Sequence, residues 1–359
     1  MKRRCFFGLP LFAVLLCVFA ALAPLFAAVA ASAQTSPERV IIDTDPGNDD
    51  AMAILLALNS PQLKVEAFTV VPGNVEAKQG LENALKIVSL AGRCDIPVAG
   101  GAQHPLNQKL ITAQYWHGKN GLANVELPPS KCKPDPRFGP DLIIQLVHQY
   151  PHEITLIPVG PLTNIALAVS KDPSIAGLVK NIVIMGGSIT GGNVNAAAEA
   201  NIYNDPEAAQ IVFNAGWTVT MIGSDVGERT LITRKDLSAL RSTHGPKNDL
   251  VSSILDFYVK QSEANGYEGA AMYDPLAVAV AMDPTFCTLK DMHVDVETKG
   301  EFTRGETVAN RNGYNENNVL HGDHYEIDGV TKLKPNARVC VTSDRDRFIQ
   351  VFMSRIQGK

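Results

Sequence analysis

An acidic turn near the N-terminus holds the densest set of groups that could do chemistry. Residues 43–50 contain four carboxylates, those of Asp43, Asp45, Asp49 and Asp50. Carboxylates this close repel one another, and in a partly buried turn they raise one another's pKa. A bound cation removes that cost, and oxygen ligands without Cys or His select a hard ion, calcium or magnesium. Helix capping could explain Asp49 and Asp50 but hardly all four acids, so the turn predicts a metal site.

The elements around the turn must place these acids at the end of a strand. Short β-rich runs that end in Gly, Pro, Asn or Asp alternate with helical patterns. This alternation predicts a single α/β domain with a mostly parallel central sheet flanked by helices. Ligand sites in such sheets lie beyond the carboxyl ends of the strands, where the acidic turn falls. The predicted strands are 39–43, 65–71, 154–158, 182–185, 218–222 and 339–341, the predicted helices are 51–58, 78–90, 162–170 and 345–356, and 310–334 is predicted to be a polar excursion or hairpin.

Several segments, taken in order, resemble those of one enzyme family. The acidic turn and the apolar residues 51–54 after it are similar to the N-terminal signature of the nucleoside hydrolases, the inosine–uridine-preferring type. The resemblance extends from about Val40 to the terminal helix near Phe348, and it implies the fold described above. The other matching segments are Val71-Pro72-Gly73-Asn74, Trp116-His117-Gly118, residues 121–122, residues 158–164, Met185-Gly186-Gly187, Gly192-Asn193, Glu199-Ala200-Asn201, residues 205–209 and Tyr273-Asp274-Pro275.

The resemblance implies hydrolysis of the N-glycosidic bond of a ribonucleoside to ribose and free base. Such a bond breaks through an oxocarbenium-like transition state. The family's Ca²⁺ ligands match Asp45, Asp50, Asp274 and the backbone carbonyl of Val159 in this chain. Asp45 also matches the general base that accepts a proton from the attacking water. Asp43 would lie behind the residues that contact the ligand and orient them. Family members are dimers or tetramers, so the resemblance implies a homodimer or homotetramer that acts on a small-molecule nucleoside.

Six further residues match those that bind the sugar in the family. Glu199 and Asn201, two positions apart in a segment expected to be extended, would point the same way. Asn193 could equally be a turn residue after Gly191-Gly192, and Met185 has the type of a core residue. The residues that match the sugar-binding set are Asp49, Asn74, Met185, Asn193, Glu199 and Asn201.

Two positions bear on how the base leaves. His117 matches a family histidine close to the site, and Trp116 beside it could stack on a base or simply pack. Tyr273 stands where the family commonly has His. Its hydroxyl, with a pKa of about 10, donates a proton less readily than an imidazolium. Its ring could instead stack on a purine, as an aromatic residue does in purine-specific relatives, so we expect a purine or mixed purine and pyrimidine preference.

The helix before Tyr273 could also line the base side of the site. Phe257, Gln261 and Tyr267 lie on or beside this predicted helix. Phe257 could equally be part of the core.

The first 33 residues have the features of a signal peptide. Three basic residues at positions 2–4 precede a long apolar run, and Ala31-Ser32-Ala33 supplies small residues for cleavage after Ala33. The run is long enough for an uncleaved membrane anchor, but Pro24 breaks it late. We therefore expect export, by the general or the twin-arginine route, and a periplasmic mature enzyme, residues 34–359, without stable membrane insertion.

Composition and cysteine content limit the alternatives. The chain has 45% apolar and 19% charged residues, which excludes a disordered protein. Its net charge is −5 with the leader, and the mature chain is more acidic, so nucleic acid is not an expected partner. Four cysteines remain after the leader, Cys94, Cys132, Cys287 and Cys340. They allow three disulfide pairings or could stay as small buried residues.

Two other functions fit part of the pattern. A haloacid-dehalogenase-type phosphohydrolase also has an Asp-x-Asp loop after its first strand and binds magnesium. Pro46-Gly47 and the Tyr273-Asp274-Pro275 segment do not fit that motif. An exported nucleoside- or sugar-binding protein without turnover would be expected to have lost Asp45 or Asp50, and both are present.

Overall fold

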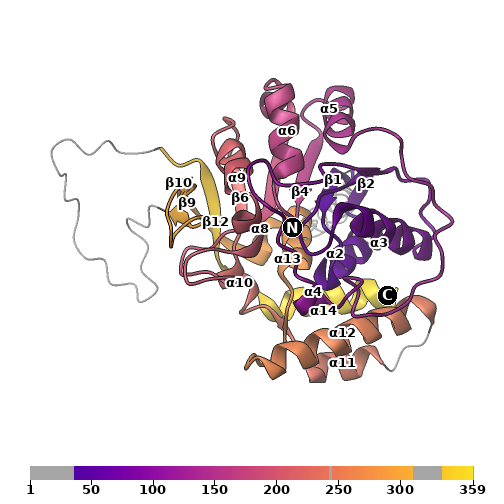
Figure 1. Ribbon diagram of the computed structural model, residues 1–359. Coiled ribbons are helices and arrows are strands. Elements are labelled where there is room, and N and C mark those ends of the chain that lie inside the picture. The colour runs from indigo at the N-terminus through magenta and orange to yellow at the C-terminus, as the bar shows by residue number, and fades with distance from the viewer. Residues whose placement is uncertain (1–35, 242–244, 310–333, 359) are drawn as a thin grey trace, which may run out of the picture. The chain divides into compact units, whose positions relative to one another are not determined.

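The computed structural model describes residues 36–241, 245–309 and 334–358. The described residues from Glu38 onward form one compact unit, drawn in Figure 1. The predicted signal peptide lies outside the described residues, as does all but Lys334 of the excursion predicted at 310–334. In the described part, no helix is both long and apolar enough to cross a membrane.

Eight strands form the central sheet, and the prediction of a mostly parallel α/β fold is confirmed. Seven neighbouring strands run parallel, and only the edge strand β9 is antiparallel to its neighbour. The strands are β1 (Glu38–Thr44), β2 (Leu63–Val70), β3 (Val98–Gly100), β4 (Ile154–Pro158), β5 (Asn181–Met185), β6 (Val219–Ile222), β9 (Cys287–Met292) and β12 (Ala337–Ser343).

The order of these strands is β3-β2-β1-β4-β5-β6-β12-β9. Strand β1 has β2 on one side and β4 on the other, so the chain order reverses direction there. A crevice forms at such a switch point beyond the carboxyl ends of the strands. The residues that follow β1 are the acidic turn, which the topology therefore places at this crevice.

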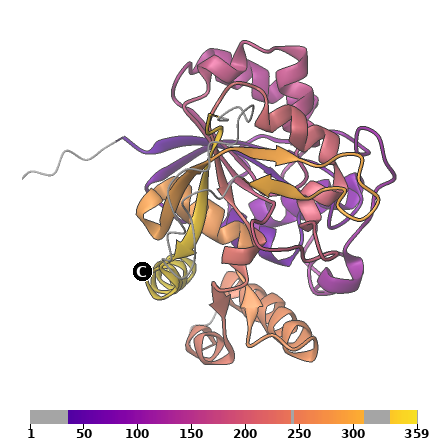
Figure 2. The same ribbon diagram turned by 90° about the vertical axis from the view of Figure 1, so that its left-hand side faces the viewer.

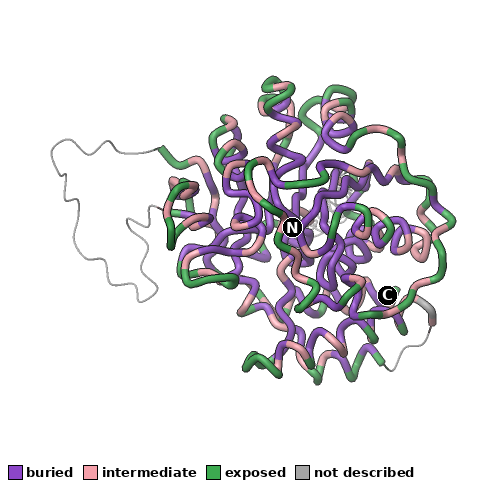
Figure 3. The backbone as a smooth tube through the Cα atoms, viewed as in Figure 1, coloured by how far each residue is buried: buried purple, intermediate pink, exposed green. Residues whose placement is uncertain are grey.

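Helices bury both faces of the sheet (Figure 1). Along β1, Val40 and Ile42 belong to one apolar cluster and Ile41 to the other, because successive side chains of a strand point to opposite faces. The first cluster includes residues of α2, α3, α12, α13 and α14, and the second includes residues of α5, α6 and α9. The buried inner elements and the exposed outer helix faces are visible in Figure 3. The helices of these two layers are α2 (Asn48–Leu58), α3 (Ala77–Leu90), α12 (Pro246–Ala264), α13 (Tyr273–Met282) and α14 (Arg345–Gln357), and α5 (Gly139–Gln149), α6 (Thr163–Lys171) and α9 (Pro206–Phe213).

Smaller elements complete the fold. A two-stranded antiparallel ribbon joins β10 to β11, and a second joins β7 to β8. Figure 2 shows the unit turned by a quarter, with the strands of the sheet fanned by their twist. The remaining elements are α4 (Gln114–His117), α7 (Ile175–Leu178), α8 (Ala200–Asn204), α10 (Ser224–Gly227), β7 (Leu231–Ile232), α11 (Arg234–Leu240), β8 (Ala270–Ala271), η1 (Pro284–Phe286), β10 (Val294–Val296) and β11 (Thr307–Ala309).

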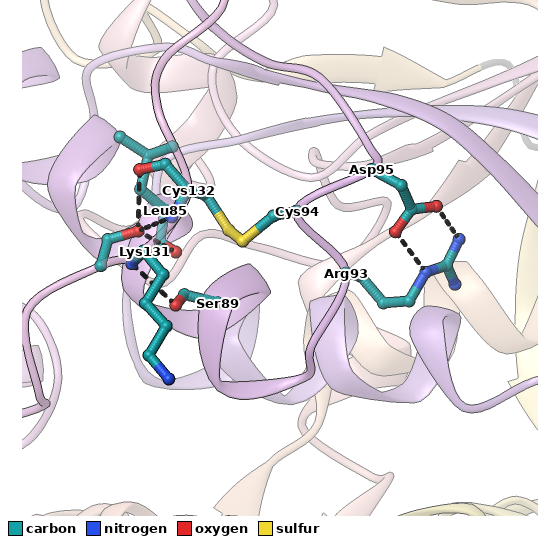
Figure 4. Close-up of a disulfide and its surroundings, with 8 residues drawn as sticks. Leu85, Ser89, Arg93, Cys94, Asp95, Lys131 and Cys132 are labelled. Carbon is teal, nitrogen blue, oxygen red and sulfur yellow. Dashed lines mark hydrogen bonds and ion pairs between the residues drawn. A yellow bond between two sulfur atoms is a disulfide. The ribbon is translucent and has the colours of Figure 1, made fainter.

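All four cysteines of the described chain form disulfides. Cys94 pairs with Cys132, and Cys287 in β9 pairs with Cys340 in β12. The first bond anchors the long connection between β3 and α5, which carries α4, to the turn after α3 (Figure 4). The backbone N–H of Lys131 beside it donates to Ser89 Oγ of α3, at 3.0 Å. The sequence left three pairing schemes open, and the structure has the one in which the first of these cysteines is bonded to the second and the third to the fourth.

Candidate active site

Asp50 organises the acidic turn between β1 and α2. Its Oδ1 accepts hydrogen bonds from Thr44 Oγ1 at 2.5 Å and from the backbone N–H of Asp45 at 3.1 Å. Its Oδ2 accepts from the backbone N–H of Gly47 at 2.8 Å and from Asn74 Nδ2 at 3.0 Å. The helix-capping interpretation is therefore correct for this acid, which satisfies N–H groups that would otherwise lack partners.

Asp43 ties the end of β1 to its neighbours. Its Oδ1 accepts hydrogen bonds from Thr69 Oγ1 of β2 at 2.5 Å and from Asn164 Nδ2 of α6 at 2.7 Å. Burial raises the pKa of Asp43 to about 7, while these two donors lower it. Asp43 thus holds the end of β1, where the acidic turn begins, to β2 and α6.

Three carboxylates come together at the start of two helices. Oxygen atoms of Asp49 and Asp50 from α2 and of Asp274 from α13 all lie within 4.8 Å of one another. Burial is the main cause that raises the pKa of Asp49 and Asp274 well above the ordinary value, and the neighbouring carboxylates raise it further. Asp49, which the sequence assigned to the sugar, thus lies in this cluster as well.

A hard cation fits this donor set. The cluster offers only oxygen atoms, which calcium and magnesium prefer. Among the described residues, Asp45 Oδ1 and Asp49 Oδ1 are buried without a hydrogen-bond partner. A buried unpartnered oxygen is costly, and a cation would remove both this cost and the repulsion. The cluster with Asp274 could therefore hold a metal ion.

The backbone of three residues, Gly73, Asn74 and Gly160, closely approaches the carboxylate of Asp45. Its Oδ2 accepts a hydrogen bond from the N–H of Asn74 at 2.6 Å. A Cβ atom at Gly73 would lie 2.1 Å from Asp45 Oδ2, and one at Gly160 would lie 2.6 Å from Asp45 Oδ1. Real Cβ atoms do not come this close, so any side chain at either glycine would displace the carboxylate.

Most predicted site residues line one cavity of about 330 Å³. Asp45 and Asp50 are not among the residues that line it, and both are fully buried. The cavity lies at the carboxyl edge of the sheet, because Val159 directly after β4, Met185 at the end of β5 and Asp49 at the start of α2 all line it. The predicted residues that line it are Asp49, Asn74, His117, Val159, Met185, Asn193, Glu199, Asn201, Tyr273 and Asp274.

Glu199 is a helix cap, so the expectation of an extended segment from Glu199 to Asn201 is wrong. Its Oε1 accepts from the backbone N–H of Asn201 at 2.9 Å, and its Oε2 accepts from Ile202 at 3.2 Å and from Gly187 at 2.9 Å. Burial raises the pKa of Glu199 to about 7, and these N–H donors lower it. The capping side chain folds back onto α8 because four N–H groups at a helix start need acceptors.

The side-chain amides of the asparagines that line the cavity also form hydrogen bonds within the protein. Asn201 Nδ2 donates to the carbonyl of Val159 at 2.9 Å and to that of Met185 at 3.1 Å. Asn193 Oδ1 accepts from the N–H of Ala200 at 3.0 Å. Asn201, which is predicted to bind the sugar, thus contacts the Val159 carbonyl, which is predicted to bind the metal. Met185 both lines the cavity and is buried in the core.

His117 is a neutral imidazole in this site. Its Nδ1 accepts a hydrogen bond from the backbone N–H of Asn48 at 3.0 Å. Burial lowers the pKa of His117 to about 4, although the Asp50 charge raises it. The 3.9 Å approach of Asp49 Oδ1 to His117 Nδ1 is therefore not an ion pair at neutral pH. The ring proton is on Nε2, so His117 can donate a hydrogen bond but does not act there as an imidazolium acid.

Tyr273 begins α13, next to Asp274. Burial and the nearby charge of Glu228 raise the pKa of Tyr273 well above 10, and the side chain of Asn193, which faces the phenol, lowers it. The hydroxyl therefore stays protonated at neutral pH. This state suits either proton donation or stacking, the two roles left open by the sequence.

One face of α12 supplies cavity residues that the sequence alone did not identify. Tyr258 and Ser262 of α12, four residues apart, line the cavity, and so does Asn265, the residue that caps the end of the helix. Phe257 instead packs against the core, and Gln261 Nε2 donates to the carbonyl of Tyr115 at 3.3 Å. Helical periodicity could have identified Tyr258, had the register of α12 been known.

Of the three residues named from the sequence near this helix, only Tyr267 lines the cavity. Its ring meets Trp116 edge to face, with centroids 6.4 Å apart. Trp116 also lines the cavity, so it both packs and is available to a ligand.

Comparisons with known proteins show the family to which the chain belongs. The profile of the family described as inosine-uridine preferring nucleoside hydrolase matches residues 40–350. The chain is 39% identical to the pyrimidine-specific ribonucleoside hydrolase RihA of Citrobacter koseri over 319 residues, which are 88% of this chain and 97% of that protein. It is likewise 39% identical to the RihA of Salmonella enteritidis over 320 residues, 89% of this chain and 98% of that one.

Two solved structures share the fold. The plant nucleoside hydrolase PpNRh1 has a TM-score of 0.80 and 39% identity, with 89% of this chain and 99% of that chain covered. The purine-preferring ribonucleoside hydrolase from Gardnerella vaginalis has a TM-score of 0.80 and 37% identity, with 89% and 98% covered. These matches leave no support for a phosphohydrolase or for a binding protein without turnover. The chain belongs to the family of inosine–uridine preferring nucleoside hydrolases and is an N-glycosidase that acts on ribonucleosides.

Proposed function

We propose that this enzyme hydrolyses purine nucleosides, or purine and pyrimidine nucleosides alike, with Ca²⁺ in the carboxylate cluster and Asp45 as the general base. The observation that carries the proposal is Asp45 Oδ1, a buried carboxylate oxygen without a partner among the described residues, beside a cavity lined by acids and amides. Burial and the charge of Asp50 raise the pKa of Asp45 well above its ordinary value, which suits a group that must accept a proton.

Asp50, Asp274 and the Val159 carbonyl would hold the ion, with Asp45 and Asp49 beside them. When bound, Ca²⁺ supplies a positive charge that neutralises these acids and makes a nearby water easier to deprotonate. Calcium is favoured over magnesium because the site combines several carboxylates with a backbone carbonyl, a mixed oxygen shell that calcium accepts.

The other side chains would hold the nucleoside. Asn74, Asn193 and Asn201 carry amide groups into the cavity, and together with Asp49 and Glu199 they would bind the ribose hydroxyls and orient the anomeric carbon. His117 Nε2–H would donate to the substrate as a neutral group. Tyr273 would serve the departing base, either with its hydroxyl or with its ring.

Aromatic side chains support a purine or mixed preference. Trp116, Tyr258, Tyr267 and Tyr273 all line the cavity, and flat aromatic surfaces stack well on a large base. The base preferences of the named relatives differ, since RihA is pyrimidine-specific and the Gardnerella enzyme is purine-preferring.

A reducing-sugar assay over inosine, adenosine, guanosine, uridine and cytidine tests the proposal. We expect ribose release that is faster from purines than from pyrimidines or similar for both. Release from uridine and cytidine alone would contradict the base preference. Tyr273→Phe separates the two roles of Tyr273, because an unchanged rate means that the ring and not the hydroxyl matters.

We also propose that residues 1–33 are removed after export and that the mature enzyme is a periplasmic homodimer or homotetramer. The two disulfides support export, because such bonds persist in oxidising compartments. The mass of the protein recovered from the periplasm tests the cleavage site after Ala33, and light scattering during gel filtration tests the oligomer. A chain that retains its leader in the membrane fraction would contradict cleavage.

A further inference from the structure

We propose that Gly227 is a positioning residue for Tyr273 and that this contact helps to set which base the cavity accepts. The inference rests on the proposed role of Tyr273 at the base side of the site. It concerns α10, an element that contributes no residue to the cavity wall.

The backbone conformation does not explain why residue 227 is glycine. The φ of Gly227 lies outside the positive region that favours glycine, so the conformation at the end of the short helix α10 does not require glycine there. A Cβ atom at this position would lie 2.1 Å from Cδ1 and 2.7 Å from Cε1 of Tyr273. The three nearest atoms to that Cβ all belong to the tyrosine ring. The missing side chain therefore makes room for Tyr273.

The backbones on both sides of this contact are fixed. The N–H of Gly227 donates to Gly223 at 3.1 Å, and its carbonyl accepts from Thr230 at 2.9 Å. Thr230 in turn accepts from the N–H of Met272 at 3.0 Å, directly before Tyr273. A methyl group at Gly227 would therefore be accommodated by rotation of the tyrosine ring rather than by separation of the two helices.

Rotation of the ring would change the base side of the cavity more than the sugar side. Tyr273 lines the cavity, and the side chain of Asn193 faces its hydroxyl. Asn74 and Asn201 are held by other elements, through Asp50 and through the Val159 carbonyl. A substitution at Gly227 should therefore alter discrimination between bases.

The test compares Gly227→Ala in two backgrounds, with Tyr273 and with Tyr273→Ala. The substrates are inosine, adenosine, uridine, cytidine and p-nitrophenyl riboside, whose leaving group needs neither a proton nor a base pocket. With Tyr273 present, we expect the purine-to-pyrimidine ratio of kcat/KM to change by about tenfold, because one methyl group in a pocket typically changes discrimination between substrates by about this factor. The rate with the nitrophenyl substrate should be affected least. In the Tyr273→Ala background, the same ratio should stay constant. Gly177→Ala is the matched control, because among the described residues nothing lies within 4 Å of a Cβ placed at this exposed glycine.

An equal loss for every substrate, or the same change of ratio in both backgrounds, would overturn the proposal. If Gly227→Ala fails to fold, recovery of folded protein in the Tyr273→Ala background supports the contact, and failure in both backgrounds overturns it. Absence of ribose release by the parent would instead contradict the proposed function. The contact would then be judged by melting temperature, which Gly227→Ala should lower only when Tyr273 is present.

Discussion

His117 Nδ1 accepts a hydrogen bond from the backbone N–H of Asn48, 3.0 Å away. This bond joins the long connection that carries α4 to the acidic turn, two segments far apart in the sequence. It also decides the chemistry of the ring, because a nitrogen that accepts a hydrogen bond carries no proton. His117 is therefore a neutral donor and not the charged acid that a site histidine suggests.

The protonation of His117 predicts how stability responds to acid. The pKa of about 4 in the folded protein lies below the ordinary value of about 6.5 of an unfolded histidine. Between these values the unfolded chain binds more protons, so stability falls as the pH is lowered from about 6.5 to about 4, by about 3 kcal/mol for this group. Urea unfolding at pH 7 and pH 4.5 should show a smaller acid loss for His117→Gln than for the parent. Equal losses would mean that His117 is protonated in the folded protein.

Gly160→Ala should impair catalysis through Asp45. Because a Cβ at Gly160 would lie 2.6 Å from Asp45 Oδ1, the carboxylate must move, and a displacement near 1 Å can reduce turnover by about a hundredfold. Steady-state kinetics should show a fall in kcat with an intact far-ultraviolet circular dichroism spectrum. The exposed Gly177→Ala serves as the control, with kinetics like those of the parent. A parent-like rate for Gly160→Ala would show that Asp45 tolerates displacement.

Asp45→Asn should fold and lose turnover. The amide keeps the shape of the carboxylate and can still accept the hydrogen bond from Asn74, but it cannot take a proton from water. Loss of a general base typically costs about 10²–10⁴-fold in rate. Asp95→Asn is a suitable control, since Asp95 forms an exposed ion pair with Arg93. Activity of Asp45→Asn within tenfold of the parent would remove Asp45 from the base role.

Removal of metal should abolish activity and lower stability. Without a cation, the buried acids of the cluster are left to repel one another. A ligand that binds only the folded state raises its stability according to concentration and affinity. Dialysis against a chelator should therefore stop ribose release and lower the melting temperature, and Ca²⁺ should restore both. Full activity after exhaustive chelation would contradict the metal proposal.

The parts of the fold that depend on local pattern could be predicted from the sequence. The strand expected at 39–43 is β1 (Glu38–Thr44), and the helix expected at 78–90 is α3 (Ala77–Leu90). Strand ends are marked by turn residues, and parallel crossover units follow from the alternation. The position of the acidic turn at the carboxyl edge followed from the same reasoning.

Features that depend on distant pairing could not be predicted. The strand expected at 339–341 is β12, but its pairing with the antiparallel β9 involves strands about fifty residues apart. The contacts of Glu199 with three backbone N–H groups depend on where α8 begins, and one residue of error turns a cap into an extended segment. On α12, Tyr258 lines the cavity and its neighbour Phe257 packs against the core. An error of one residue in the predicted register of this helix would therefore have assigned the two positions the wrong way round.

The two disulfides have a consequence for how the chain reaches its folded state. A chain threaded across a membrane from its N-terminus presents its cysteines in order. Cys94 and Cys132 are separated by 38 residues, and Cys287 and Cys340 by 53. If the chain is exported as proposed, the native partner of each second cysteine is the one that emerges immediately before it. An oxidant that simply joins thiols as they appear would make the correct bonds, without a later step of disulfide isomerisation.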